Sequence, residues 1–160
     1  MKTQIRRYRP ADRKQVLAAF RTNVPEHFPA TEESWLRACL DDPDGPFFVV
    51  VEGQPQQVIA FGGYEISPFY NLATLVFGLV RADRHQLGIG RRLLAYRLRH
   101  MAQSRSRPRY VTVDTHPHTA GFFVRCGFEE IARWPGGYRS GRDRVDLRFE
   151  LTDAALAALP

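Results

Sequence analysis

The sequence VRADRHQLGIGRRLL, from Val80 to Leu94, decides how the rest of the chain is arranged. The residues just before it, 75–80 (LVFGLV), form an apolar run of the length of a buried strand. After it, Leu98 and Met101 continue from Leu94 at helical spacing. The pattern therefore predicts a strand, a polar loop and a helix from about Gly88 to Ser104.

Two glycines one residue apart, Gly88 and Gly90, lie where this helix is predicted to begin. Glycine has no Cβ, so a ligand can approach its backbone closely. The first amides of a helix have no intrahelical partner and carry the positive end of the helix dipole. Strand, glycine loop and helix together predict an anion site, of the kind that binds a pyrophosphate. Tight packing of a helix start against a sheet is the alternative that needs no ligand.

Two familiar phosphate loops do not fit this stretch. A P-loop requires Lys and Ser or Thr after its last glycine, and here Arg91 and Arg92 follow Gly90. A dinucleotide-binding loop requires a third glycine, where this chain has Leu93. Its strand also runs almost directly into the first glycine, whereas about seven residues separate Val80 from Gly88.

The stretch resembles the acetyl-CoA loop of the GNAT superfamily of N-acetyltransferases. That pattern is an apolar strand ending in Val, about five residues, and then Arg/Gln-x-x-Gly-x-Gly/Ala at the start of a helix. Val80, His85, Gly88 and Gly90 fall in this register. His85 departs from it, because Arg or Gln is usual there. The phosphate contacts of the family are largely backbone amides, so the resemblance predicts that the loop tolerates this change.

A second motif strengthens the resemblance. GNAT members usually carry Asn-x-x-Ala-x-x-Phe/Leu-Tyr-x-x-x-Gly-Phe after the fifth strand. Residues 122–128 (FFVRCGF) match the end of this pattern. Its front half departs, with His116 in place of Asn and Thr119 in place of Ala. Phe123 stands where the family has its Tyr, which usually protonates the leaving thiolate.

The remaining segments follow the order of that fold. We expect strands at 5–8, 47–51, 57–65, 73–80, 110–113, 130–134 and 144–151. Further helices are expected from Pro10, from Thr31 (as N-cap), over 119–125 with Gly127 as the C′ residue, and over 152–159 capped by Thr152. The resemblance implies an α/β (α+β) fold: a mixed, mostly antiparallel sheet of about seven strands with flanking helices. It also implies a splay between strands four and five and a single N-acetyltransferase domain over 1–160.

The resemblance further implies acetyl-CoA as the acyl donor, no metal, and a primary amine of a small molecule or peptide as acceptor. Pantetheine would enter the splay like an extra strand. The residues implied to bind the cofactor are Leu79, Val80, His85, Gln86, Leu87, Gly88, Ile89, Gly90, Arg91 and Phe123.

The catalytic candidates follow from what acyl transfer to an amine requires. The amine must lose a proton, and the thiolate must be protonated or leave unassisted. Some family members place a Glu on the fourth strand, but this chain has Thr74 there. Glu65 and His116 are the candidate bases, and Asp114 is also expected near the predicted cleft. His116 has a suitable pKa, because histidine titrates near neutral pH. Tyr138, in a glycine-rich loop, is the candidate acid.

Length and composition limit the kinds of protein to which this chain can belong. The chain has 160 residues, 44% of them hydrophobic, and a formal net charge of +6. No apolar run approaches the 18 residues of a membrane span, and we expect a cytoplasmic protein that is a monomer or a homodimer. Its two cysteines form no metal or disulfide pattern. Two other functions stay open: a CoA-binding module without catalysis, and, ranked last, a basic nucleic-acid-binding protein.

Overall fold

The computed structural model describes residues 2–159 and contains seven strands and five α-helices there. In chain order these are β1 (Thr3–Arg7), α1 (Arg13–Arg21), α2 (Glu33–Asp41), β2 (Phe47–Glu52), β3 (Gln57–Ser67), β4 (Leu72–Val80), α3 (Ile89–Ala102), β5 (Tyr110–Thr115), α4 (Pro117–Arg125), β6 (Glu129–Trp134), β7 (Arg144–Glu150) and α5 (Asp153–Ala157). The expected order of elements is confirmed.

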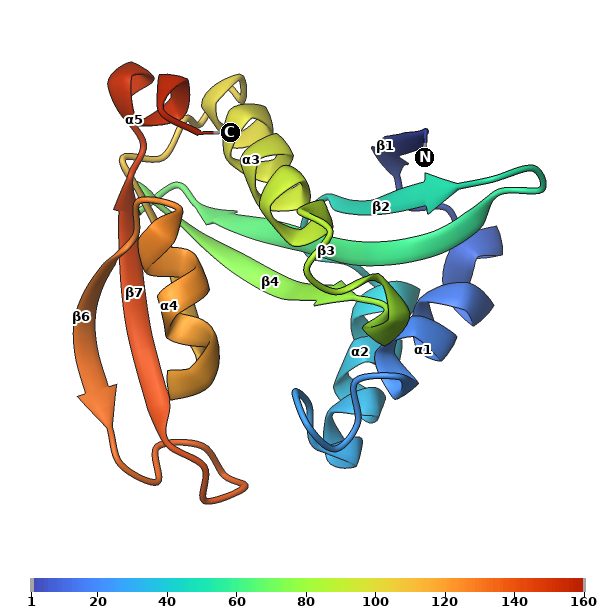
Figure 1. Ribbon diagram of the computed structural model, residues 1–160. Coiled ribbons are helices and arrows are strands. Elements are labelled where there is room, and N and C mark those ends of the chain that lie inside the picture. Colours follow the sequence, from blue (N-terminus) through green and yellow to red (C-terminus); the bar gives the residue numbers. More distant parts are fainter. Residues whose placement is uncertain (1, 160) are drawn as a thin grey trace. The chain divides into compact units, whose positions relative to one another are not determined.

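The seven strands form one sheet in the order β1-β2-β3-β4-β5-β7-β6 (Figure 1). β4 and β5 are the parallel pair, and the pairs β1–β2, β2–β3, β5–β7 and β6–β7 are antiparallel. The parallel ladder joins only Leu72–Thr74 to Tyr110–Thr112. β4 continues to Val80 and β5 to Thr115. The mixed sheet and its splay after the first few residues of the parallel pair are therefore as expected.

The chain divides into two compact units. The first comprises the residues up to Glu65 together with Val76–Arg97, and the second comprises Ile66–Leu75 and the chain from Leu98 onward. Strand β4 and helix α3 each contribute residues to both units. Each unit is described here by itself.

The core of the first unit is built on both faces of β2, all of whose residues are buried. Phe47, Val49 and Val51 belong to a cluster with the apolar faces of α1 and α2. The residue between the first two, Phe48, makes an edge contact with Tyr96 of α3, with 5.1 Å between ring centroids. Because side chains alternate along a strand, the two helix layers lie on opposite sides of it, as Figure 1 shows.

The core of the second unit lies between α4 and the strands β5, β6 and β7. Phe128 joins Phe123 of α4 to Phe149 of β7, with ring centroids 5.3 and 5.2 Å apart. Gly127 has a φ of +97°, and its N–H donates to the carbonyl of Val124. This is the predicted C′ glycine that ends the helix. In the same unit, Thr152 caps α5 by accepting from the N–H of Ala155, also as predicted.

Four predicted helix starts were wrong. Pro10 begins a 3₁₀ turn over Pro10–Asp12, and α1 begins only at Arg13. Thr31 is not the N-cap of α2, because it lies in a 3₁₀ turn over Ala30–Glu32 and the helix begins at Glu33. Gly88 lies outside α3, since its φ of +76° is not helical. Helix α4 begins at Pro117, two residues earlier than expected, because proline is well accommodated in the first turn of a helix.

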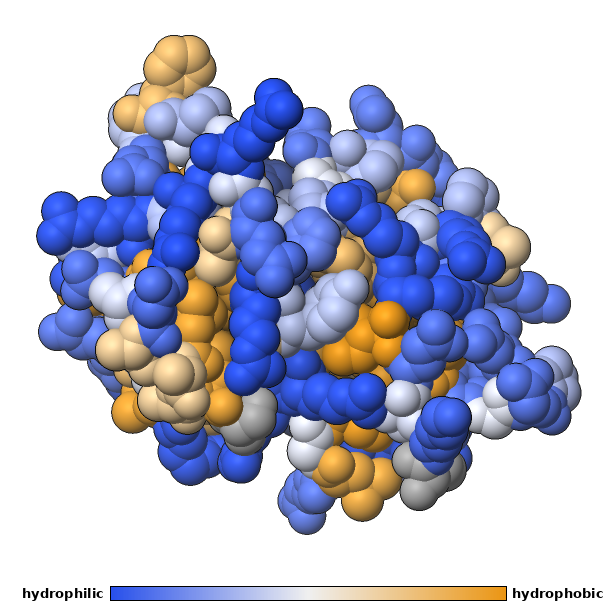
Figure 2. Space-filling model, turned by 90° about the horizontal axis from the view of Figure 1, so that it is seen from above, coloured by the Kyte–Doolittle hydropathy of each residue, from blue (hydrophilic) through white to orange (hydrophobic). Residues whose placement is uncertain are grey.

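Hydrophilic side chains cover most of the face shown in Figure 2, with smaller apolar patches between them. Within residues 2–159, no helix has both the length and the apolar character needed to cross a membrane.

Candidate functional site

The loop before α3 has the backbone geometry that its glycines predict. Gly88 is exposed, has a φ of +76°, and has no heavy atom within 4 Å of the place where a Cβ would stand. Gln86 is also left-handed, with a φ of +61°. The helix starts at Ile89, and the N–H of Arg92 donates to the Gly88 carbonyl at 3.0 Å. The backbone of this loop is therefore open to a ligand on the side of Gly88.

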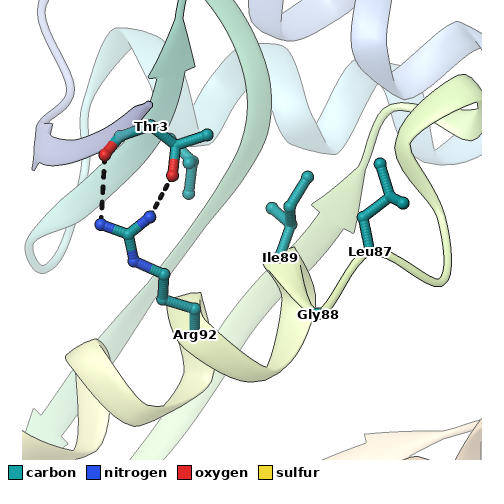
Figure 3. Close-up of a pocket in the computed structure, with 6 residues that line it drawn as sticks. Thr3, Leu87, Gly88, Ile89 and Arg92 are labelled. Atoms are coloured by element: carbon teal, nitrogen blue, oxygen red, sulfur yellow. Dashed lines mark hydrogen bonds between the residues drawn. The ribbon is translucent and has the colours of Figure 1, made fainter. Parts of the chain in front are cut away.

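A pocket of about 350 Å³ adjoins this loop and is lined by Thr3, Val50, Leu87, Gly88, Ile89 and Arg92. Figure 3 shows the side chains of Leu87, Ile89 and Arg92 on the same side of the loop and helix. The guanidinium of Arg92 donates to the hydroxyl and to the carbonyl oxygen of Thr3. This arginine therefore joins the first turn of α3 to β1.

The end of β4 is held by side chains that contact the carbonyl of Val80. Asn23, which is buried, donates from Nδ2 at 2.9 Å, and His85 contacts the same oxygen through Nε2 at 2.8 Å. A carbonyl oxygen can only accept, so His85 carries a proton on Nε2. Both lone pairs of the Val80 oxygen have a partner. His85 therefore stabilises the start of the loop through a contact inside the protein.

Further contacts fix the residues between β4 and the glycines. Arg84 forms a 2.8 Å ion pair with Glu52, which is only 7% exposed. The backbone N–H of Ala82 donates to the hydroxyl of Thr22 at 3.0 Å. Asp83 accepts from Arg81, and this hydrogen bond is the main cause of its lowered pKa. The loop is thus attached to β2 and to the end of α1.

An aromatic cluster lies beside β4 in the same unit. Trp35 of α2 is 52% exposed and packs on Phe77 with 4.5 Å between ring centroids, and Phe28 contacts Phe77 from a second side. Glu65, near the end of β3, is half-buried. Burial is the main cause of the raised pKa of Cys39 on α2, and the negative charge of Glu65 raises it further. This carboxylate therefore lies near that helix.

The second unit brings two of the predicted catalytic residues together. The ring of His116, at the N-cap of α4, lies 5.0 Å from the ring of Tyr138 in an edge contact and is stacked on His118 at 5.6 Å. The Tyr138 hydroxyl donates to Asp114 at 2.7 Å. No group of three or more His, Cys, Asp or Glu side chains in residues 2–159 could hold a metal ion. The contacts of Tyr138 place an imidazole, a phenol and a carboxylate side by side, and such groups can transfer protons.

The two residues that replace family side chains have structural partners. Phe123 is 9% exposed and makes edge contacts with Phe122 and Phe128. The hydroxyls of Thr74 and Thr112 lie 3.3 Å apart across the parallel pair. Neither position carries an ionisable group.

The site candidates fall into two groups. Those from Leu79 to Arg91 lie in the first unit with Glu65, whereas Phe123, His116 and Tyr138 lie in the second. The predictions did not include Asn23, which is 57 residues from Val80 in sequence and has no motif of its own. They also did not include the aromatic contact of Trp35 with Phe77, because each side chain alone is typical of a core position.

Comparisons with known proteins bear on the family and the fold of the chain. Residues 13–128 match the family model described as the acetyltransferase (GNAT) family. A Desulfovibrio desulfuricans protein assigned to the GNAT acetyltransferases is 22% identical, with a TM-score of 0.79 over 94% of this chain and 100% of that one. The ribosomal-protein-S18-alanine N-acetyltransferase of Escherichia coli is 16% identical, with a TM-score of 0.72 over 94% and 95% of the two chains.

A variant of the spermidine N-acetyltransferase SpeG from Vibrio cholerae is 13% identical, with a TM-score of 0.72 over 92% of this chain and 95% of that one. At these identities the solved structures share the fold alone. No curated protein matches the chain.

Proposed function

Because this chain belongs to the GNAT family of acetyltransferases, we propose that it transfers an acetyl group from acetyl-CoA to a primary amine of a small molecule or peptide. The observation that carries this proposal is the open backbone at Gly88, directly before α3. Amides from Gln86 to Arg91 would bind the pyrophosphate there. Hydrogen bonds to a charged group contribute about 1.5–3 kcal/mol each, more than an exposed ion pair with one arginine.

The pantetheine arm would lie along the part of β4 that has no ladder partner on β5. Its amides would bond the backbone of Leu79 and Val80, in the manner of an added strand. The Val80 carbonyl already accepts from Asn23 and His85, so Val80 would contribute its N–H.

The chemistry would be direct attack of the amine nitrogen on the thioester carbonyl carbon. A C–N bond forms, the C–S bond breaks, the amine loses a proton and the thiolate gains one. Glu65 or His116 would accept the amine proton. Tyr138 would protonate the thiolate in place of the tyrosine that Phe123 replaces. A thiol pKa of roughly 8.5 also allows the thiolate to leave without an acid.

Two measurements test this proposal in sequence. Calorimetric titration with acetyl-CoA should show binding, and no binding at high micromolar acetyl-CoA would contradict the proposal. Release of free CoA should then be followed with a panel of amino acids, polyamines, antibiotics and peptides with free N-termini. Binding without turnover of any amine would favour a CoA-binding module instead. Salt-sensitive binding of nucleic acid, without acetyl-CoA binding, would favour the third hypothesis.

A further inference from the structure

Helix α3 carries an arginine inside the core of the first unit. Arg97 is only 3% exposed, and it follows Leu94 on the apolar stripe of the helix. Its pKa is lowered to about 10 by burial, and no acidic side chain in residues 2–159 counters this effect. The guanidinium is therefore still protonated at neutral pH, and its Nε has no hydrogen-bond partner among the described residues. Burying a charge without a counter-ion is costly, so packing alone does not explain an arginine at this position.

Two glycines make the space for this cation. A Cβ at Gly62 of β3 would lie 2.9 Å from Nη1 of Arg97, and a Cβ at Gly78 of β4 would lie 3.2 Å from Nη2. Gly78 is exposed, whereas Gly62 is buried. The positive charge thus lies next to the backbone of β4 at Gly78, a residue that has no side chain to cover the strand.

The cation contacts the strained residue of β4. Nη1 of Arg97 donates to the carbonyl of Phe77 at 2.9 Å and to that of Gly63 at 3.1 Å. Phe77 has a φ of +55°, which bulky side chains rarely adopt. Its ring is fixed by Trp35 from α2, while its carbonyl is fixed by Arg97 from α3. Such strain persists only where surrounding contacts hold it, and it is concentrated at functional sites.

In a trans peptide the C=O and the N–H point in opposite directions. Because the Phe77 carbonyl is turned toward Arg97, the N–H of Gly78 in the same peptide is turned away from it. Donation to the carbonyl also polarises the peptide and makes its N–H a stronger donor. A fixed, polarised donor of this kind stabilises the negative charge that develops on a carbonyl oxygen during acyl transfer.

We propose that Arg97 is a positioning residue that holds and polarises the Phe77–Gly78 peptide, so that the Gly78 amide donates to the thioester oxygen of bound acetyl-CoA. This inference rests on the proposed function, since it needs a thioester beside β4. In this arrangement Arg97 does not contact acetyl-CoA and acts on it only through the Phe77–Gly78 peptide.

Infrared spectroscopy of bound acetyl-CoA labelled with ¹³C at its carbonyl tests the inference without knowledge of the acceptor. In the wild type the carbonyl band should move to lower wavenumber than in free acetyl-CoA. Arg97→Met should bind acetyl-CoA with affinity within a few-fold of the wild type, yet its band should return toward that of the free ligand. Arg97→Lys, which keeps a cation, should restore part of the shift, and Arg99→Met, on the exposed side of α3, should match the wild type.

A second variant covers the case in which Arg97→Met does not fold. Gly62→Ala keeps the arginine but displaces the end of its side chain, and it should also reduce the band shift. The ¹⁵N resonance of the Gly78 amide should move in each variant that perturbs the guanidinium, with or without ligand.

The outcomes separate the two proposals. An unchanged carbonyl band in a folded, acetyl-CoA-binding Arg97→Met protein would overturn the role of Arg97 and leave the proposed function intact. Failure of the wild type to bind acetyl-CoA would overturn both.

Discussion

The hydroxyl of Tyr138 donates a 2.7 Å hydrogen bond to Oδ2 of Asp114, across the gap between the β6–β7 loop and β5. The ring of this tyrosine also makes an edge contact with the ring of His116, with 5.0 Å between ring centroids. If Tyr138 acts as the acid, its hydroxyl must release Asp114 before it protonates a thiolate.

Tyr138→Phe removes the hydroxyl and retains the ring contact with His116. If Tyr138 is the acid, acetyl transfer should slow by roughly 10²–10⁴-fold, the usual range for a positioned proton donor. The dissociation constant for acetyl-CoA should stay nearly the same, because the residue lies outside the phosphate loop. The rate of CoA release and calorimetric binding separate the two effects. Asp114→Asn is the matched variant, since it keeps a hydrogen-bond acceptor, and it should slow the reaction less.

Gly90→Val tests the backbone approach at the start of α3. Valine is a better helix former than glycine, so the fold should be retained. Its branched side chain would prevent the close approach of a pyrophosphate, and acetyl-CoA binding should be lost. Gly90→Ala is the graded control, because the family pattern accepts alanine at this position, and it should retain measurable binding. Wild-type affinity in Gly90→Val, by calorimetry, would contradict the loop model.

The strand, loop and helix around Gly88 could be predicted because their signals are local: an apolar run, two glycines and a helical repeat. The contact between Asn23 and Val80 could not, because it joins residues 57 apart without a pattern at either end. Arg97 did leave a signal, since it interrupts the apolar stripe between Leu94 and Met101. The cavity that accepts it depends on glycines from two other strands, and only the folded chain brings them together.

His85→Ala and His85→Gln test why this chain tolerates histidine in its loop. Alanine removes the donor to the Val80 carbonyl, and a typical hydrogen bond contributes about 0.5–1.5 kcal/mol. Acetyl-CoA should therefore bind roughly 3–10-fold more weakly to His85→Ala. Glutamine carries an N–H₂ donor and should recover most of this loss. Equal affinities for the two variants would show that the bond to Val80 does not support the loop.

Glu52→Gln tests the attachment of the same loop to β2. Glu52 is 7% exposed and forms ion pairs with Arg84 at 2.8 Å and with Arg81 at 3.8 Å. Glutamine has a similar shape but no charge, so both arginines lose their buried counter-ion. We expect faster amide hydrogen exchange over residues 81–87 and weaker acetyl-CoA binding. Asp83→Asn, at an exposed partner of the same arginines, should change both quantities less.

Asp12 makes the stability of the first unit depend on pH. Its carboxylate accepts two hydrogen bonds from Arg6, at 2.8 and 2.9 Å, and one from the N–H of Arg9. The bonds to Arg6 are the main cause of its lowered pKa. A carboxyl group with a lowered pKa stabilises the fold above its unfolded pKa, and this contribution is lost as the pH falls through its folded pKa.

Asp12→Asn should therefore lower the free energy of unfolding by about 1.5–3 kcal/mol near neutral pH, the contribution of charge-assisted hydrogen bonds. The cost should shrink as the pH falls from about 4, the pKa of an aspartate in the unfolded chain, through the lower pKa of folded Asp12. Urea unfolding of both proteins on either side of that pH measures the difference. Asp41→Asn breaks the exposed pair with Arg13, so its cost should stay under about 1 kcal/mol. If the cost of Asp12→Asn did not change with pH, the carboxylate would not be the source of the stabilisation, and the packing of its side chain would have to account for it.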